Sequence, residues 1–263
     1  MNSRLAWIVL SAVLLAACGG GSGGSGSSDS TPRPGSPPAV PDSDITLLFM
    51  GNSHTSVNDL SGTVTAMVQA ANPDKTVFGT EAPGWMFLDE RLDHAQTLAV
   101  LRSHPWSFVV LQAQKYSSSG QFNYSTAEAE ELIRRSRALG AVPILFPEWP
   151  RKDIAETERI YNLHTSIAQR EPACVAPVGQ AWDLSLARYP NLVLHAADGN
   201  HSAPAGAFLA ALILSATITQ GAPLELPFIE GTNVDTETQA LLRGIANETV
   251  NMVAPRLWCP ADA

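Results

Sequence analysis

The stretch Ile45-Thr-Leu-Leu-Phe-Met50, followed at once by Gly51-Asn52-Ser53-His54-Thr55, decides the fold of this chain. A short apolar run without regular polar alternation is typical of a strand that is buried on both faces. The small polar residues behind it predict a tight turn from that strand into a helix. Four later runs have the same character, and together with the first they predict a buried sheet: 76–80, 108–112, 142–146 and 174–177.

Amphipathic segments separate these runs and predict helices over 57–71, 95–103, 126–139 and 154–169. Strands that alternate with helices form right-handed βαβ units. We therefore expect residues 45–263 to form one α/β domain, a three-layer α/β/α sandwich with a parallel sheet. Ligands of such sheets bind beyond the C-terminal ends of the strands. Functional residues are thus expected just after the apolar runs.

Composition excludes several classes of protein. The chain has 263 residues, 45% of them hydrophobic, and its 16 Lys and Arg against 25 Asp and Glu give a net charge of -9. Phosphate backbones repel such a protein, so we expect no nucleic-acid partner. Three cysteines without a Cys-x-x-Cys pair argue against a structural zinc site, and no other metal site is expected. No apolar run reaches the roughly 18 residues that a membrane span requires.

The N-terminus has the features of an export signal. Arg4 precedes a short apolar stretch, and residues 1–17 are expected to be removed as a signal peptide. The sequence Leu15-Ala16-Ala17-Cys18 resembles the bacterial lipobox, which implies cleavage before Cys18 and lipidation of that cysteine. Gly19 fits the family rules for delivery to the outer membrane. The resemblance thus implies an exported protein that meets the membrane through its N-terminal lipid only; an ordinary signal peptide is the alternative.

Residues 18–44 are expected to be the lipidated cysteine and a linker. Their Gly/Ser-rich and then Pro-rich composition cannot bury apolar surface, which predicts disorder. Cleavage would leave two cysteines, Cys174 and Cys259. In an oxidising compartment the two can form a disulfide, and two free buried thiols are the alternative.

Polar residues with chemical potential follow the predicted strands. Ser53 comes after the first strand, but a serine in such a turn is often only a helix cap. The turn lacks the Gly-Lys-Ser/Thr ending of a phosphate loop, and it lacks the last glycine of the Gly-x-Ser-x-Gly elbow. Asp198 and His201, three residues apart before a predicted helix, supply what a serine nucleophile needs. These are a base for the proton and a carboxylate that orients the base.

These motifs resemble those of the SGNH (GDSL-like) hydrolase superfamily over roughly residues 45–225. Gly51-Asn52-Ser53 resembles block I of that superfamily, with Asn52 in place of the usual Asp. Gly84 is the candidate for the block II glycine, and Gln114 stands where block III has an Asn. Asp198-Gly-Asn-His201 resembles block V. The resemblance implies the flavodoxin-like arrangement of the SGNH hydrolase fold.

The resemblance also implies a role for each residue. Ser53 would attack an acyl carbonyl, His201 would take and return the proton, and Asp198 would orient the imidazole. The oxyanion would be bound by the N–H groups of Ser53 and Gly84 and by the side-chain amide of Gln114. Gln112 is the alternative for the last position. Such a triad implies no cofactor.

Further residues near the strand ends are candidates for substrate contacts. We expect Gln112, Trp85 and Glu148 to be such contacts, because all three come directly after predicted strands or their turns. Trp149 is interpreted as a packing residue, since large aromatic side chains at such positions are usually buried. His54 is interpreted as a residue that makes local hydrogen bonds beside Ser53.

The expected function is that of an exported serine esterase that hydrolyses small acyl esters through an acyl-enzyme. A tethered cell-surface enzyme meets polysaccharide, so an O-acetyl group on a carbohydrate is the expected substrate. Two alternatives stay open: an O-acyltransferase that uses the same site, and an inactive binding lipoprotein on an SGNH scaffold. The Asn52 and Gln114 departures favour the second alternative, whereas the presence of Ser53 with Asp198 and His201 favours an enzyme. Acyl length, leaving group and oligomeric state are left open.

Overall fold

The computed structural model describes residues 40–261. The expected signal peptide, Cys18 and the linker up to residue 39 lie outside the described residues. The final linker residues lead directly into the first strand, and Asp44 accepts hydrogen bonds from the backbone and side chain of Thr76.

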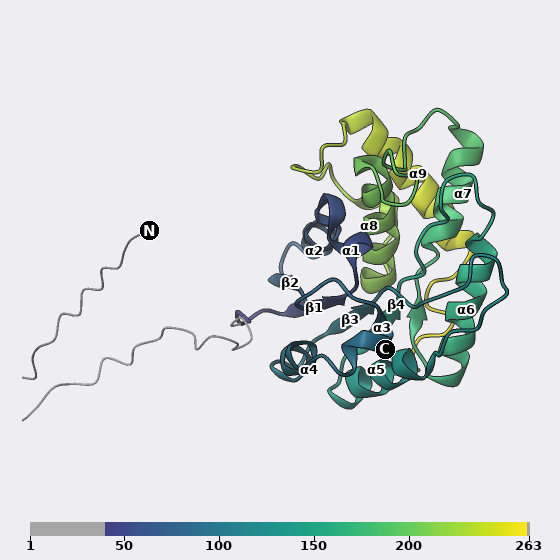
Figure 1. Ribbon diagram of the computed structural model, residues 1–263. Helices are drawn as coiled ribbons and strands as arrows, with labels where there is room; N and C mark the ends of the chain where they lie inside the picture. Colours follow the sequence, from purple (N-terminus) through teal and green to yellow (C-terminus); the bar gives the residue numbers. More distant parts are fainter. Residues whose placement is uncertain (1–39, 262–263) are drawn as a thin grey trace, which may run out of the picture. The chain divides into compact units, whose positions relative to one another are not determined.

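A five-stranded parallel sheet lies at the centre of the domain (Figure 1). Its strands are ordered β2-β1-β3-β4-β5, which is the flavodoxin-like order. The prediction of a parallel α/β sheet is therefore confirmed. In this order the strand sequence reverses between β1 and β3, and ligands bind at that switch point. The bounds are β1 Ile45–Met50, β2 Val77–Glu81, β3 Phe108–Leu111, β4 Val142–Leu145 and β5 Cys174–Val175.

Helices cover both faces of the sheet (Figure 1). None of the helices within residues 40–261 is both long and apolar enough to cross a membrane. One face is covered by α2 Leu60–Ala71, α7 Val178–Arg188, α8 Pro204–Thr219 and α9 Thr236–Met252. The other is covered by α3 Leu88–Arg91, α4 Ala95–Arg102, α5 Ala127–Ala138 and α6 Thr157–Arg170. Three short pieces complete the chain: α1 Ser53–Ser56 and the 3-10 turns Val57–Asp59 and Pro223–Glu225.

The strands lack polar alternation because both of their faces are buried. In β1, Leu47 and Phe49 pack into the core beneath α8, whereas Leu48 and Met50 pack into the core beneath α5. Successive side chains of a strand point to opposite faces, so a strand between two helical layers must be apolar throughout.

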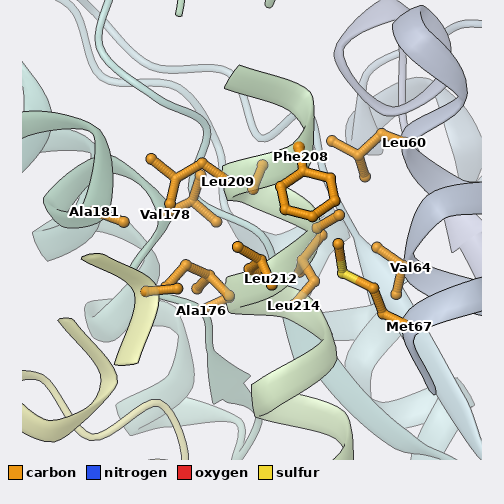
Figure 2. Packing of buried hydrophobic residues seen from close by; sticks show 14 of the residues in the cluster. Leu60, Val64, Met67, Ala176, Val178, Ala181, Phe208, Leu209, Leu212 and Leu214 are labelled. Atoms are coloured by element: carbon orange, nitrogen blue, oxygen red, sulfur yellow. The ribbon is translucent and has the colours of Figure 1, made fainter. Parts of the chain in front are cut away.

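The helix α8 is apolar on all sides because other elements surround it. Every residue from Gly206 to Ile218 is buried, and a helix without a polar face is stable only inside a core. Phe208 of α8 points toward Leu60 of α2, and Leu209 points toward Val178 at the start of α7 (Figure 2). The loop that carries the candidate base leads directly into this helix, so the core holds that loop in place.

The predicted helix over 57–71 is broken in the structure. Asn58 and Asp59 adopt φ values of 58° and 49°, so the chain forms α1, a 3-10 turn and then α2. Asn and Asp tolerate this left-handed conformation better than other non-glycine residues. The break places the Asn58 amide where Nδ2 donates to the carbonyl oxygen of Ser202, 2.7 Å away. It therefore connects the segment after Ser53 to the loop after His201.

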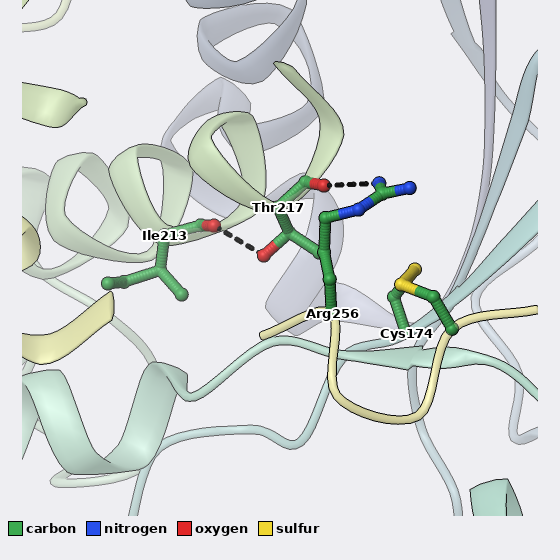
Figure 3. The surroundings of a disulfide bond; sticks show 5 residues. Cys174, Ile213, Thr217 and Arg256 are labelled. Atoms are coloured by element: carbon green, nitrogen blue, oxygen red, sulfur yellow. Dashed lines mark hydrogen bonds between the residues drawn. A yellow bond between two sulfur atoms is a disulfide. The ribbon is translucent and has the colours of Figure 1, made fainter. Parts of the chain in front are cut away.

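Cys174 and Cys259 form a disulfide that joins β5 to the C-terminal segment. The same segment makes two further contacts beside it. The N–H of Val175 donates to the carbonyl oxygen of Pro255 at 3.0 Å. The Arg256 guanidinium donates to the carbonyl oxygen of Thr217 at the end of α8 (Figure 3). The disulfide thus fixes the chain end against an edge strand of the sheet.

Candidate active site

Three side chains form a linear chain of hydrogen bonds beyond the end of β1. Ser53 is the first residue of α1, and Asp198 and His201 lie in the loop before α8. Ser53 Oγ is 2.8 Å from His201 Nε2, and His201 Nδ1 is 2.6 Å from Asp198 Oδ2. The sequence predicted a nucleophile, a base and an orienting carboxylate at these positions, and the fold brings their atoms together in that order.

The Asp198 carboxylate is held in its ionised form. Its hydrogen bond with the His201 ring lowers its pKa well below the usual range, and the N–H groups of Asn200 and His201 lower it further. Both N–H groups donate to Asp198 Oδ1 at 2.9 Å. An ionised carboxylate at Nδ1 keeps the proton of a neutral imidazole on that nitrogen. His201 Nε2 is then free to accept the hydroxyl proton of Ser53.

A second histidine supports the first. His54 is buried, and its ring centroid lies 5.1 Å from that of His201 and 5.0 Å from that of Trp149. Burial, together with the nearby His201, lowers the pKa of His54 to about 4. His54 is thus neutral at neutral pH and does not repel a positive charge that forms on His201. Its Nδ1 lies 3.2 Å from Asn52 Oδ1, which agrees with the predicted local hydrogen bond. The stacking on His201 was not predicted, because it depends on tertiary contacts.

Gln112 supports the serine turn from below. Its Oε1 accepts from the N–H of Asn52 at 2.9 Å and from the hydroxyl of Thr55 at 3.0 Å. A Cβ at Gly51 would lie only 2.5 Å from the same Oε1, so this position requires glycine. Gln112 is completely buried and does not line the cavity. It therefore holds the turn, and it is not placed to contact a substrate or an oxyanion as the sequence suggested.

Gln114 lies at the edge of the cavity, at the position expected for block III. The residue before it, Ala113, has a φ of 75°, a strained conformation for a residue with a Cβ. The Gln114 Nε2 donates to the carbonyl oxygens of Lys115 and Ser125, at 3.0 and 2.9 Å. A side-chain amide has only two hydrogens, so neither remains for an oxyanion. The predicted role of Gln114 as an oxyanion donor does not fit these hydrogen bonds.

Two backbone N–H groups expected at the oxyanion hole are free. Within residues 40–261 no acceptor takes the N–H of Ser53 or that of Gly84. Gly84 has a φ of 79°, which favours glycine. Gly84 itself does not line the cavity. The structure therefore brings its loop close to the serine turn without placing the Gly84 N–H in the cavity wall.

Arg91 connects these two loops, and the sequence analysis missed it. Its side chain is fully buried, and its guanidinium donates to the carbonyl oxygens of Gly51 at 2.5 Å and Gly84 at 2.8 Å. It also donates to the Thr97 hydroxyl at 3.0 Å. Burial lowers the pKa of Arg91 to about 10, so it remains cationic at neutral pH. In the sequence it follows Glu90 in a short polar segment, where an exposed side chain is the ordinary expectation.

A cavity of about 530 Å³ opens beside Ser53. Glu148, which the sequence suggested as a substrate contact, lines this cavity, and its Oε2 accepts from Gln112 Nε2 at 2.9 Å. Burial raises the pKa of Glu148 to about 7. Trp85 is 66% exposed and does not line the cavity, and Trp149 is buried as expected for a packing residue. The cavity is lined by Asn52, Ser53, His54, Phe87, Gln114, Lys115, Tyr116, Ser118, Tyr124, Glu148, Arg151, Asn200 and His201.

The side chains of residues 40–261 include no group of three or more His, Cys, Asp or Glu that could bind a metal ion.

No family model matches the chain, and no curated protein matches it either. Solved structures do match. A candidate SGNH hydrolase from Slackia heliotrinireducens superposes with a TM-score of 0.53 and 26% identity, over 67% of this chain and 99% of that one. The chain belongs to the SGNH hydrolase superfamily.

A second solved structure has the same fold. A DUF4886 family protein from Bacteroides uniformis ATCC 8492 has a TM-score of 0.60 and 14% identity. The match covers 80% of the present SGNH protein and 96% of the other chain. The two proteins thus share the α/β fold.

Proposed function

We propose that this SGNH-superfamily protein is a serine esterase that hydrolyses small acyl esters. The observation that carries the proposal is the chain of hydrogen bonds from Ser53 through His201 to Asp198, at 2.8 and 2.6 Å. This geometry matches what nucleophilic acyl transfer requires of a nucleophile, a base and an orienting group. The fold of the superfamily supports ester hydrolysis in general.

The reaction proceeds in two steps through an acyl-enzyme. Ser53 Oγ attacks the ester carbonyl carbon while its proton moves to His201 Nε2, and the carbonyl oxygen becomes an oxyanion. Collapse of this intermediate breaks the bond to the leaving alkoxide, which takes the proton from His201. A water molecule then attacks the acyl carbon and gives a proton to His201. Collapse of this second intermediate breaks the bond between the acyl carbon and Ser53 Oγ, which takes the proton back from His201 as the carboxylic acid leaves. Throughout, Asp198 stays ionised and stabilises the imidazolium.

The lining of the cavity supports a carbohydrate as the alcohol part of the ester. The rings of Phe87 and Tyr124 are 38% and 48% exposed at the cavity, where they can stack on a sugar ring. Glu148, with a pKa of about 7, can donate to or accept from a sugar hydroxyl. Such a mixed polar and aromatic surface suits a hydroxyl-rich group better than a long acyl chain. The proposed substrate is therefore an O-acetyl group on a carbohydrate.

The two cations at the cavity do not favour an anionic substrate. Lys115 Nζ is 2.6 Å from Asp89 Oδ2, and Arg151 Nε is 3.1 Å from Glu156 Oε1. Each positive charge already has a carboxylate partner. A neutral acetylated sugar fits this balance.

The proposal includes the location of the enzyme. Lipidation of Cys18 would tether it to a membrane, most suitably the outer membrane, where it meets cell-surface polysaccharide. Metabolic labelling with a fatty acid tests this part: label should enter the protein and should be lost in Cys18→Ser. Labelling that persists in Cys18→Ser would reject lipidation at that residue.

Ester hydrolysis by the protein and by Ser53→Ala tests the chemistry. We expect activity that falls steeply from acetyl to longer acyl chains and that is lost in Ser53→Ala. Activity that survives the substitution would overturn the mechanism. A folded protein without activity on any ester would also reject the esterase, and added sugar acceptors would then reveal an acyltransferase.

A further inference from the structure

The candidate oxyanion hole lacks one donor. Four side-chain carboxamides lie near Ser53, at positions 52, 112, 114 and 200. Gln114 gives both hydrogens to backbone carbonyl oxygens, and Gln112 is completely buried and donates to Glu148. A hole with only backbone donors would be weaker, because one side-chain donor contributes on the order of 10²–10³ in rate.

Asn52 and Asn200 are the two whose side-chain hydrogens meet no acceptor within residues 40–261, and of these Asn52 directly precedes the nucleophile Ser53, whereas Asn200 directly precedes the base His201. The Oδ1 of Asn52 accepts from the N–H of His54 at 3.0 Å and lies 3.2 Å from His54 Nδ1. This hydrogen bond fixes the orientation of the amide, since Nδ2 could not accept from that N–H. Within residues 40–261 nothing accepts from Asn52 Nδ2, although Asn52 lines the cavity next to Ser53.

We infer that Asn52 Nδ2 is the side-chain donor of the oxyanion hole, in place of Gln114. The inference rests on the proposed esterase function and adds a catalytic residue to it. An aspartate at position 52, as block I usually has, could accept from the His54 N–H equally well but has no hydrogen to donate. The two departures from the superfamily pattern thus compensate for each other. The amide at block III has become structural, and an amide at block I replaces it.

Two neighbouring groups keep this donor in place. The backbone N–H of Asn52 donates to Gln112 Oε1 at 2.9 Å, which fixes the main chain. His54 is neutral at neutral pH, with a pKa lowered to about 4, and its Nδ1 lies 3.2 Å from Asn52 Oδ1, so it packs against the amide without adding a charge beside the oxyanion. The donor is therefore preorganised, as effective electrostatic stabilisation requires.

The experiment compares four substitutions with the same acetyl ester. Asn52→Asp keeps the oxygen that binds the His54 N–H and removes the donor, and Asn52→Ala removes the donor without adding a charge. Gln114→Ala removes the expected donor of block III. Asn191→Asp is the matched control, because it adds the same charge at an exposed asparagine that does not line the cavity. Thermal unfolding shows which variants are folded.

We expect kcat to fall on the order of 10²–10³-fold in both Asn52 variants. We expect less than a tenfold loss in Gln114→Ala and Asn191→Asp. Binding of a charged tetrahedral analogue, such as a boronic acid, should weaken in parallel with kcat in the Asn52 variants, with KM nearly unchanged. A purely structural role of Asn52 would not produce that parallel.

Three results would overturn the inference. The first is an Asn52→Asp variant within threefold of the wild type, since the usual block I residue would then serve equally well. The second is a loss in Asn52→Asp that Asn52→Ala does not share, which would make added charge the cause. The third is a loss of 10² or more in Gln114→Ala alone. Any of these results, with Ser53→Ala still inactive, would reject the role of Asn52 and leave the esterase function standing.

Discussion

Replacement of Arg91 by Met should destabilise the protein and impair the site together. The guanidinium makes two buried hydrogen bonds, to the Gly51 carbonyl at 2.5 Å and to the Thr97 hydroxyl at 3.0 Å. Each hydrogen bond from a charged group contributes about 1.5–3 kcal/mol. Methionine fills much of the volume and avoids the cost of burying a charge, which offsets part of the loss. We therefore expect the free energy of unfolding to fall by about 2–4 kcal/mol.

The assay is thermal unfolding followed by ester hydrolysis well below the melting temperature. For a domain of this size the loss corresponds to a Tm decrease of roughly 5–15 °C. Activity of the folded variant should fall at least tenfold in kcat, because the loops of Gly51 and Gly84 lose their common partner. Arg91→Lys should recover part of both losses, since it keeps the charge but not the fork of donors.

Arg102→Met is the matched control, because Arg102 is an exposed arginine near the end of α4. Its unfolding free energy should change by less than about 0.5 kcal/mol. The reasoning is refuted if Arg91→Met melts within 1 °C of the wild type. It is also refuted if that variant is destabilised but keeps full kcat, since Arg91 would then stabilise the fold without positioning the site.

Three more predictions address strain, protonation and the disulfide. Ala113→Gly should raise the free energy of unfolding, measured by urea denaturation, by about 0.5–1 kcal/mol. The reason is that relief of the left-handed backbone strain exceeds the entropy that glycine adds to the unfolded chain, and a loss of stability would contradict this. Burial raises the pKa of Glu148 from 4.5 to about 7, so the folded state binds more protons and stability falls as pH rises between these values. Glu148→Gln should flatten that part of a Tm-against-pH curve, and an unchanged slope would reject the buried carboxyl. Replacing Cys174 and Cys259 by Ser should cost about 4–5 kcal/mol for a loop of 85 residues, and equal stability under oxidising and reducing conditions would show that the disulfide contributes little.

The sheet could be predicted from the sequence because burial on both faces leaves a direct pattern. The first strand was predicted with its observed bounds, Ile45–Met50, and the others begin or end within a residue or two of theirs. The break at Asn58 and Asp59 was not predictable in the same way. The amphipathic pattern continues across it, and what stabilises the two left-handed residues is a tertiary hydrogen bond to Ser202.

The candidate site could be predicted as a set of residue types but not as a set of hydrogen bonds. Ser53 and the Asp198–His201 pair were selected by chemistry and spacing, which the sequence displays. Gln112 and Gln114 lie two residues apart at one strand end, and no pattern tells which carbonyl or carboxylate each amide meets. The role of Arg91 was harder still to predict, because the sequence does not distinguish a buried arginine from an exposed one.

The buried polar side chains around Ser53 and His201 cost free energy, which argues that the site serves catalysis. A buried arginine, a buried glutamine and a buried histidine each cost free energy unless every one of them has partners. Arg91 and Gln112 form hydrogen bonds with the segment Gly51–Thr55. His54 packs against the ring of His201. A protein that only bound a ligand would not need three buried polar side chains around this serine turn. It would have no need to hold a neutral imidazole behind His201, or to keep His201 Nε2 within 2.8 Å of a serine hydroxyl. The substitutions at positions 52 and 114 are therefore better explained as parts of a rearranged oxyanion hole than as signs of decay.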